Sequence, residues 1–187
     1  MRMSIVFVKP DLVVLYDRLR AREPAEYQYW LHSPETFQAR RQEDIRLAVG
    51  KAGCTIAMLV PAGLSRTQTD QYDPNPRERI EVREWHLTAT SPARSRQVEF
   101  LTVVRPYRLT DAAPPPPELT EIEGGYLLTA ATAAGRAVML LPAADEVALA
   151  AGGLTARGAI AVEVRDPEGE TLEAVTVPTP APQPAEL

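Results

Sequence analysis

This chain of 187 residues has very few of the residues that usually mark a catalytic or metal site. It has one cysteine, Cys54, so no disulfide bond can form within the chain. Cys54 lies in the apolar run 53–60 and is interpreted as a small buried side chain, because a reactive thiol needs a nearby base. The two histidines, His32 and His86, do not form a zinc-binding motif, and no phosphate loop, dinucleotide fingerprint or hydrolase elbow occurs.

Long apolar runs and an excess of positive charge are absent as well. The net charge of −5 argues against a nucleic-acid partner, since phosphate binding needs a basic surface. No run approaches the roughly 20 apolar residues that cross a bilayer, so no membrane partner is expected. The short apolar stretch after Met1 ends at Lys9-Pro10 and does not match a signal peptide. As written, the chain predicts a cytoplasmic protein; as part of a longer protein with an export signal upstream it would be periplasmic or secreted.

Proline is abundant, with 18 residues, and it divides the chain. Residues 112–118 include four consecutive prolines and are expected to form a stiff, extended spacer. A Pro-rich tail follows at 178–187 and is expected to be flexible. We therefore expect a single β-sandwich domain over residues 1–177, in two parts separated by the spacer.

Alternating and β-branched runs predict strands through most of residues 1–177. Three pairs of runs joined by turn signals predict hairpins, at 45–49 with 54–60, 125–130 with 136–141, and 160–165 with 171–177. Further strands are expected at 4–8, 12–17, 27–32, 79–88 and 98–104. Only 144–151 favours a helix, and a single helical turn is considered there. The predicted fold class is all-β, a β-sandwich or supersandwich of about a dozen antiparallel strands.

The candidate binding residues gather around the two tryptophans. Tyr29, Trp30 and His32 share one predicted strand, and Trp85 and His86 lie in another. Because side chains alternate along a strand, Trp30 and His32 are expected on one face, and Trp85 and His86 on opposite faces. Each histidine can be structural, or it can serve as a metal ligand or general base.

Asp17 is the candidate metal ligand beside His32. It closes an apolar strand, where a carboxylate can bond loop amides, pair with an arginine or bind a cation. Asp17 and His32 would supply two ligands to a divalent metal, zinc or calcium, and such sites normally use three or four protein ligands. The polar segment 67–79 is interpreted as a surface loop whose Gln, Asn, Asp, Tyr and Arg groups also suit sugar hydroxyls and carboxylates.

The first part of the chain resembles a known family. The run 6–19 contains the elements Lys-Pro-Asp and Asp-Arg-Leu, and it is followed by Trp30-Leu31-His32 and later by the strand 100–106. Together these are similar to the C-terminal β-domain of the heparinase II/III-like polysaccharide lyases, over about residues 4 to 108. The resemblance implies a β-supersandwich. It also implies an N-terminal α-helical domain that supplies the catalytic tyrosine and much of the cleft, and this domain has no counterpart here.

Two function classes stay open on the sequence. In the first, the chain is a non-catalytic β-sandwich that supports polysaccharide binding or packing against a partner, and the partners are an acidic polysaccharide, an α-helical lyase domain or a second copy. In the second, it is a minimal uronate lyase that acts by β-elimination around His32 or His86, Tyr29 and arginines. The resemblance carries over only Asp17 and His32, as metal ligands, and no catalytic residue is assigned. The sequence favours the first class.

Overall fold

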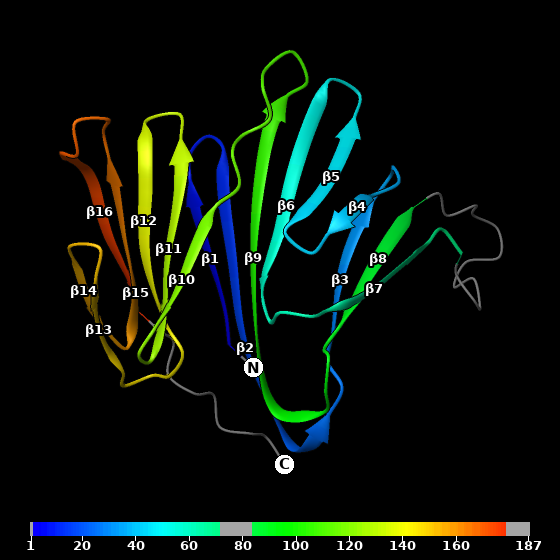
Figure 1. Ribbon diagram of the computed structural model, residues 1–187, viewed down its shortest axis with the longest axis horizontal. Helices are drawn as coiled ribbons and strands as arrows, with labels where there is room; N and C mark the ends of the chain where they lie inside the picture. The colour runs from blue at the N-terminus through cyan, green and yellow to red at the C-terminus, as the bar shows by residue number, and fades with distance from the viewer. Residues whose placement is uncertain (1, 72–83, 179–187) are drawn as a thin grey trace. The chain divides into compact units, whose positions relative to one another are not determined.

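The computed structural model describes residues 2–71 and 84–178, and these are built from β-strands and connecting turns (Figure 1). Sixteen strands form within those ranges, which confirms the all-β, antiparallel prediction. No helix that could cross a membrane occurs in these two ranges. Contacts within the chain define two compact units: unit 1 is Met1–Leu19 with Pro115–Leu187, and unit 2 is Arg20–Pro114. The prediction of a single domain over 1–177 stays a prediction.

Unit 1 combines an N-terminal hairpin with a five-stranded sheet. The hairpin is β1 (Arg2–Val8) with β2 (Leu12–Ala25), which continues into unit 2. The sheet has the order β10-β11-β12-β15-β16, with the bounds Glu118–Ile122, Gly125–Thr132, Gly135–Pro142, Ala159–Arg165 and Thr171–Pro178. The β11–β12 and β15–β16 pairs are the two C-terminal hairpins predicted from the sequence.

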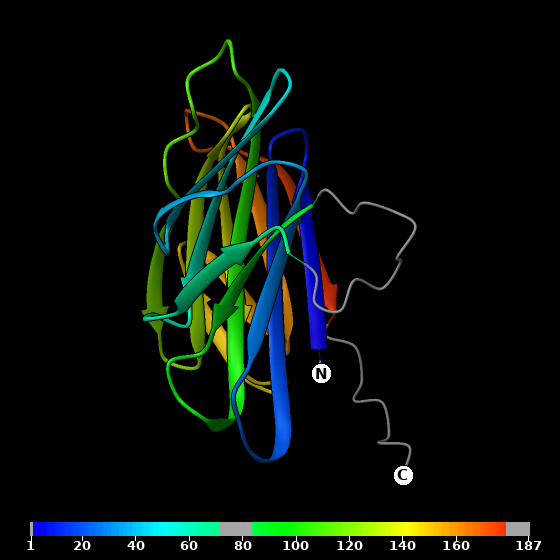
Figure 2. The ribbon, with the colours of Figure 1, turned by 90° about the vertical axis from the view of Figure 1, so that its right-hand side faces the viewer.

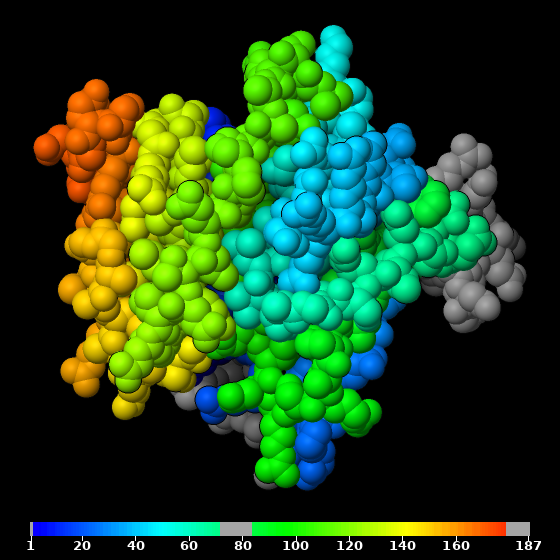
Figure 3. Space-filling view, in the orientation of Figure 1, coloured from blue at the N-terminus to red at the C-terminus, as the bar shows by residue number. Residues whose placement is uncertain are grey.

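The five-stranded sheet of unit 1 is covered on both faces. On one face the hairpin of β13 (Ala148–Ala151) and β14 (Leu154–Arg157) buries Leu149 and Leu154 against β12 and β15, and it forms part of the surface in Figure 3. On the other face Tyr16 of β2 meets the Tyr126 ring edge-on, and its hydroxyl donates to the Pro142 carbonyl at 3.2 Å. Alternate residues of the β1–β2 hairpin therefore supply the core between the two layers.

The helical turn considered at 144–151 is wrong. These residues lead into β13 instead, and the chain reverses at Gly152 and Gly153, whose φ angles are +61° and +84°. Positive φ at both turn positions matches the twist of a tight hairpin. The resulting register buries Leu149 and Leu154, and this burial outweighs the modest helix propensity of the alanines.

Unit 2 contains a four-stranded and a three-stranded sheet. The first has the order β9-β6-β5-β4, with the bounds Ser95–Arg108, Ala52–Val60, Asp44–Val49 and Gln38–Arg41. The second has the order β3-β8-β7, with the bounds Gln28–Ser33, Trp85–Thr90 and Ser65–Thr69. The predicted hairpin of 45–49 with 54–60 is confirmed as β5 and β6. The predicted strand at 79–88 lies partly outside the described residues, and its described part is β8.

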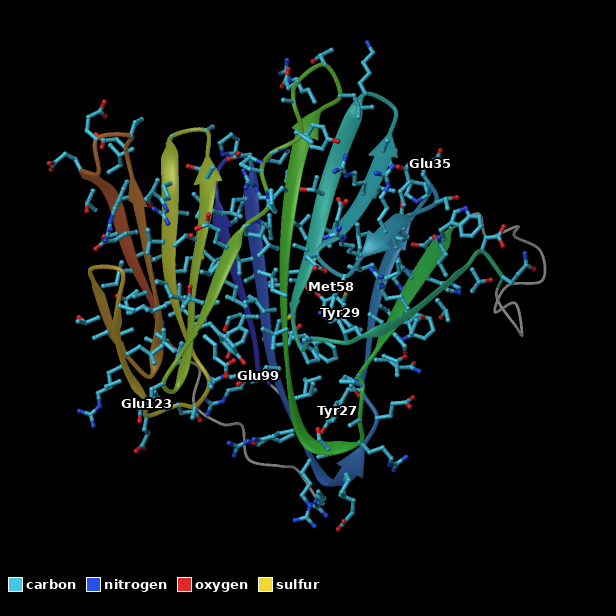
Figure 4. The ribbon with its side chains drawn as sticks, in the orientation of Figure 1. Tyr27, Tyr29, Glu35, Met58, Glu99 and Glu123 are labelled. Carbon is cyan, nitrogen blue, oxygen red and sulfur yellow. The ribbon has the colours of Figure 1, made fainter. Side chains whose placement is uncertain are left out.

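The interior of unit 2 is built by the alternation of its strands. The Tyr29 ring packs against Phe100 of β9 with 5.3 Å between ring centroids, and Figure 4 shows Tyr29 on the side of β3 that faces β6 and β9. Leu87 and Ala89 of β8 are fully buried on the same side. The residues between them along the strands point outward, and these outward residues form the candidate site.

Candidate functional site

The outer face of the three-stranded sheet carries an aromatic and polar surface, here called the Trp30 platform. Its members are Gln28, Trp30, His32, His86, Thr88 and, from β7, Thr67 and Thr69. The register places Trp30 opposite Thr88 and His32 opposite His86, so these side chains project from the same face. Thr67 and Thr69 continue the two rows because they lie opposite Thr88 and His86.

Three rings gather at the centre of the platform. Trp30 lies over His32 with a centroid distance of 6.2 Å and an interplanar angle of 23°, and it lies 5.4 Å from His86. The centroids of the two imidazoles are 6.0 Å apart, and their planes meet edge to face at 66°. His86 is only 5% exposed, whereas Trp30 is 50% exposed. The buried imidazole of His86 packs against the indole, and about half of the Trp30 surface stays open to solvent.

Hydrogen-bonding groups surround this ring. The indole Nε1 of Trp30 donates to the Gln28 side-chain oxygen at 3.3 Å, which fixes the orientation of the ring. His32 Nδ1 lies 3.5 Å from a carboxylate oxygen of Glu84, and both side chains are partly exposed. A flat ring with amide, imidazole, carboxylate and hydroxyl groups at its edge can stack on a ligand and bond its polar groups.

A side-chain amide anchors the edge of the platform. Gln68 of β7 accepts from the Phe37 backbone amide at 3.1 Å and donates to the Phe37 carbonyl at 3.0 Å. These two hydrogen bonds resemble those between the backbones of paired strands, and they connect β7 to the loop before β4. Residues 67–69 of the predicted surface loop 67–79 belong instead to the strand β7, and 72–79 lies outside the described residues.

The structure separates the predicted binding residues into two groups. Trp30, His32 and His86 meet on the platform. Tyr29 and Trp85 lie on the inward face of the same sheet, as the alternation of β3 and β8 requires. Sequence reasoning missed Gln28, which the same alternation would have found. It also missed the threonines of β7, because only the pairing of β7 with β8 brings them to the platform.

A small polar pocket lies beside the platform but on the other side of β7. It has a volume of about 270 Å³ and is lined by Arg66, Gln68, Leu64, Ala39, Leu87 and Thr67. Arg66 alternates with Thr67, so its guanidinium points away from Trp30. Of the lining residues, only Thr67 belongs to the platform.

Asp17 lies in unit 1, whereas His32 lies in unit 2. Their pairing as two ligands of one metal stays a prediction. In residues 2–71 and 84–178, no group of three or more His, Cys, Asp or Glu side chains is placed to hold a metal ion. Asp17 is 7% exposed, and burial raises the pKa of its carboxyl group. Cys54 is partly buried, and its pKa is also raised by burial, which fits the inert role expected for it.

A scan against models of protein families gives no match, and a search of curated proteins gives none either. The resemblance to the heparinase II/III-like lyases therefore stays a prediction from the sequence.

Proposed function

We propose that this protein is a non-catalytic β-sandwich module that binds polysaccharide through the Trp30 platform. The observation that carries the proposal is the half-exposed Trp30 ring, held by Gln28 and supported by the buried His86. A large apolar ring is normally covered in a folded protein, and a preformed exposed one suits a ligand with an apolar face. The C–H face of a pyranose ring is such a surface.

The groups around Trp30 suit the polar edge of a sugar. Gln28, Thr67 and Thr88 offer amide and hydroxyl groups that can donate and accept, as sugar hydroxyls do. The platform lies on regular strands of one sheet, so little conformational entropy is lost when a ligand binds. Polysaccharide chains are extended and suit an open sheet face better than an enclosed pocket.

The resemblance to lyase domains adds that the polysaccharide is acidic. The net charge of −5 and the carboxylate of Glu84 beside His32 mean that charge attraction contributes little here. Ring stacking and hydroxyl contacts are then the main sources of affinity. Binding of a uronate polymer is therefore expected to change only slightly with salt, unlike binding by a basic patch.

The alternative of a minimal uronate lyase is less well supported. Proton abstraction from a uronate needs a base, an acid and a group that neutralises the carboxylate, all within reach of one sugar. His32 or His86 can supply the base. Arg66, the nearest arginine along β7, is directed to the opposite side of the sheet from the histidines. The proposal is therefore a binding module without catalysis of its own.

Affinity electrophoresis tests the proposal directly. The wild-type chain is run in native gels that contain polygalacturonate, alginate, heparin or a neutral glucan, and its retardation gives the dissociation constant. We expect Trp30→Ala to weaken binding at least about tenfold, because a central aromatic anchor usually contributes more than 1.4 kcal/mol. Trp30→Phe is expected to retain part of the affinity. Leu109→Ala, which removes an exposed apolar side chain elsewhere on unit 2, serves as the matched control.

Two results would overturn the proposal. One is the absence of retardation of the wild-type chain by every polymer. The other is equal retardation of the wild-type and Trp30→Ala chains. An ultraviolet-absorbing unsaturated product from a uronate polymer would instead support the lyase alternative, provided that His32→Ala or His86→Ala abolishes it.

A further inference from the structure

The outward face of β1 in unit 1 is unusually apolar. Met3, Ile5 and Phe7 alternate along the strand and are 54%, 55% and 53% exposed. Val6, which points the other way, is buried. An outer strand of a soluble protein normally places polar side chains on its solvent side. In β1 the apolar side chains of Met3, Ile5 and Phe7 take these outward positions instead, which predicts that this face is covered in the working protein.

An apolar groove continues this face toward β16. The groove has a volume of about 460 Å³ and lies between β1 and the β15–β16 pair. The ribbons of β1 (blue) and β16 (orange to red) are seen near the right-hand edge of Figure 2. Its lining includes Ile5, Phe7, Val162, Val164, Leu172 and Val175. β1 pairs only with β2 and β16 pairs only with β15 within the described sheets, so sheet edges border the groove on both sides. We call this groove and the face of β1 the seam.

The exposed apolar area of the seam is close to what one partner contributes to a stable interface. Its five exposed side chains are Met3, Ile5, Phe7, Leu172 and Val175. Side chains of this size that are about half exposed leave roughly 100 Å² each, or roughly 500 Å² in all, which matches the largest patch of an ordinary monomer. A standard interface buries about 800 Å² on each partner, of which about 60% is apolar. The seam supplies this apolar share.

We infer that a second copy of this chain covers the seam, in a two-fold dimer. In such a dimer the same patch meets itself, so the exposed side chains of β1 in one copy enter the groove of the other. Lys9 and Glu173 both line the groove, so a second copy brings a cation and an anion that can pair with them. The patch carries no excess charge of one sign, and charge repulsion does not oppose self-association there.

The chain's own Pro-rich end is a poor occupant of the groove. Residues 178–184 have proline at every second position, so as an extended strand they could donate N–H groups to only one of the two sheet edges that border the groove. A second copy brings a complete apolar surface without ordering any extra segment. The dimer is expected to have a dissociation constant in the micromolar range, because the interface is of standard size and Phe7 is the one aromatic side chain among the five that each copy contributes.

Sedimentation velocity of the full chain across micromolar to millimolar concentration tests the inference. We expect the mass to rise from one copy to two. Leu172→Arg, which places a long cation in the seam, is expected to raise the dissociation constant at least about tenfold, and Ile5→Lys is expected to act in the same way. Leu109→Arg makes the same change at a side chain that is 46% exposed on unit 2, and it should leave the dimer unchanged.

Thermal unfolding followed by circular dichroism confirms that each variant is folded before it is compared. A wild-type chain that stays a monomer at every concentration would overturn the inference, and it would mean that another occupant covers the seam. An unchanged dimer in both seam variants would overturn it as well. A dimer that Leu109→Arg disrupts but Leu172→Arg does not would place the interface elsewhere.

Discussion

The two units expose aromatic and apolar side chains in opposite ways. On unit 2 a single indole, Trp30, is held by a hydrogen bond and surrounded by polar groups. On unit 1 the seam presents five apolar side chains, with Lys9 and Glu173 at its border. The Trp30 platform suits a ligand that has both an apolar face and polar groups. The seam suits a partner surface that is itself apolar.

The difference shows why exposure alone does not identify a partner. Trp30 and Phe7 are exposed to nearly the same fraction, at 50% and 53%. What separates them is the chemistry within a few ångströms of each ring. Amide, hydroxyl and imidazole groups near Trp30 suit sugar hydroxyls, whereas valines and leucine near Phe7 exclude them. The following predictions test this contrast, from the largest expected effect to the smallest.

Truncation of core side chains tests whether the two units lose their structure independently of each other. Phe100→Ala in unit 2 and Leu140→Ala in unit 1 remove fully buried side chains, and each is expected to cost about 3–5 kcal/mol of unfolding free energy. Hydrogen exchange should show lost protection in β3, β6, β8 and β9 for Phe100→Ala, and in β11, β12 and β15 for Leu140→Ala. Equal loss of protection across both units in both variants would contradict the division into two units.

Paired surface variants test whether the two surfaces work independently. Trp30→Ala is expected to weaken polysaccharide binding at least about tenfold and to leave the dimer constant unchanged. Leu172→Arg is expected to do the reverse. Affinity electrophoresis and sedimentation velocity on the same four preparations, with wild type and the double variant, check this. Loss of both properties in either single variant would show that binding and assembly are coupled.

Gln68→Ala tests how much the platform depends on its anchored edge. The variant loses both bonds to Phe37, and the expected cost is about 1–2 kcal/mol of stability with a smaller loss of polysaccharide affinity. Gln68→Glu is the matched variant, since its carboxylate can still accept from the Phe37 amide but cannot donate to the carbonyl. Chemical denaturation should rank the three chains as wild type, Gln68→Glu and Gln68→Ala. An equal midpoint for wild type and Gln68→Ala would show that the anchor is unimportant.

Local signals in the sequence predicted three hairpins that the structure confirms. The hairpin of β15 and β16 was indicated by Asp166-Pro167-Glu168-Gly169, and Gly169 has a φ of +94° in the turn. The Gly169 amide donates to the Asp166 carbonyl at 3.1 Å, which closes it. Such turns depend on a few adjacent residues, so the sequence carries the whole signal.

For the candidate site, the sequence predicted which side chains of a single strand share a face, but not which strands lie side by side. Alternation along β3 correctly placed Trp30 and His32 on one face, and alternation along β8 correctly separated Trp85 from His86. The meeting of His86 with Trp30 depends on the pairing of β3 with β8, which are separated by about fifty residues. No pattern within either strand encodes that register. The same holds for unit 1, which joins residues 1–19 to residues after 115.

Asp17→Asn gives the smallest expected effect and tests burial on the hairpin that carries the seam. Burial raises the pKa of the Asp17 carboxyl, and its Oδ1 has no hydrogen-bond partner among the described residues. At pH values above the ordinary pKa of an aspartate, the carboxyl group ionises more readily in the unfolded chain than in the folded one. The folded state therefore binds more protons, and the free energy of unfolding falls as the pH rises. Asn cannot ionise, and the variant is expected to gain about 1 kcal/mol at pH 7. The gain should vanish below about pH 4, where the carboxyl is protonated in both states.

Thermal unfolding of wild type and Asp17→Asn at pH 7 and below about pH 4 checks this prediction. Asp145→Asn is the control, because Asp145 is an exposed carboxylate paired with Arg2 and Arg18. A variant that is less stable than wild type at pH 7 would mean that the Asp17 charge is needed, and a cation at Asp17 would then be the explanation to test.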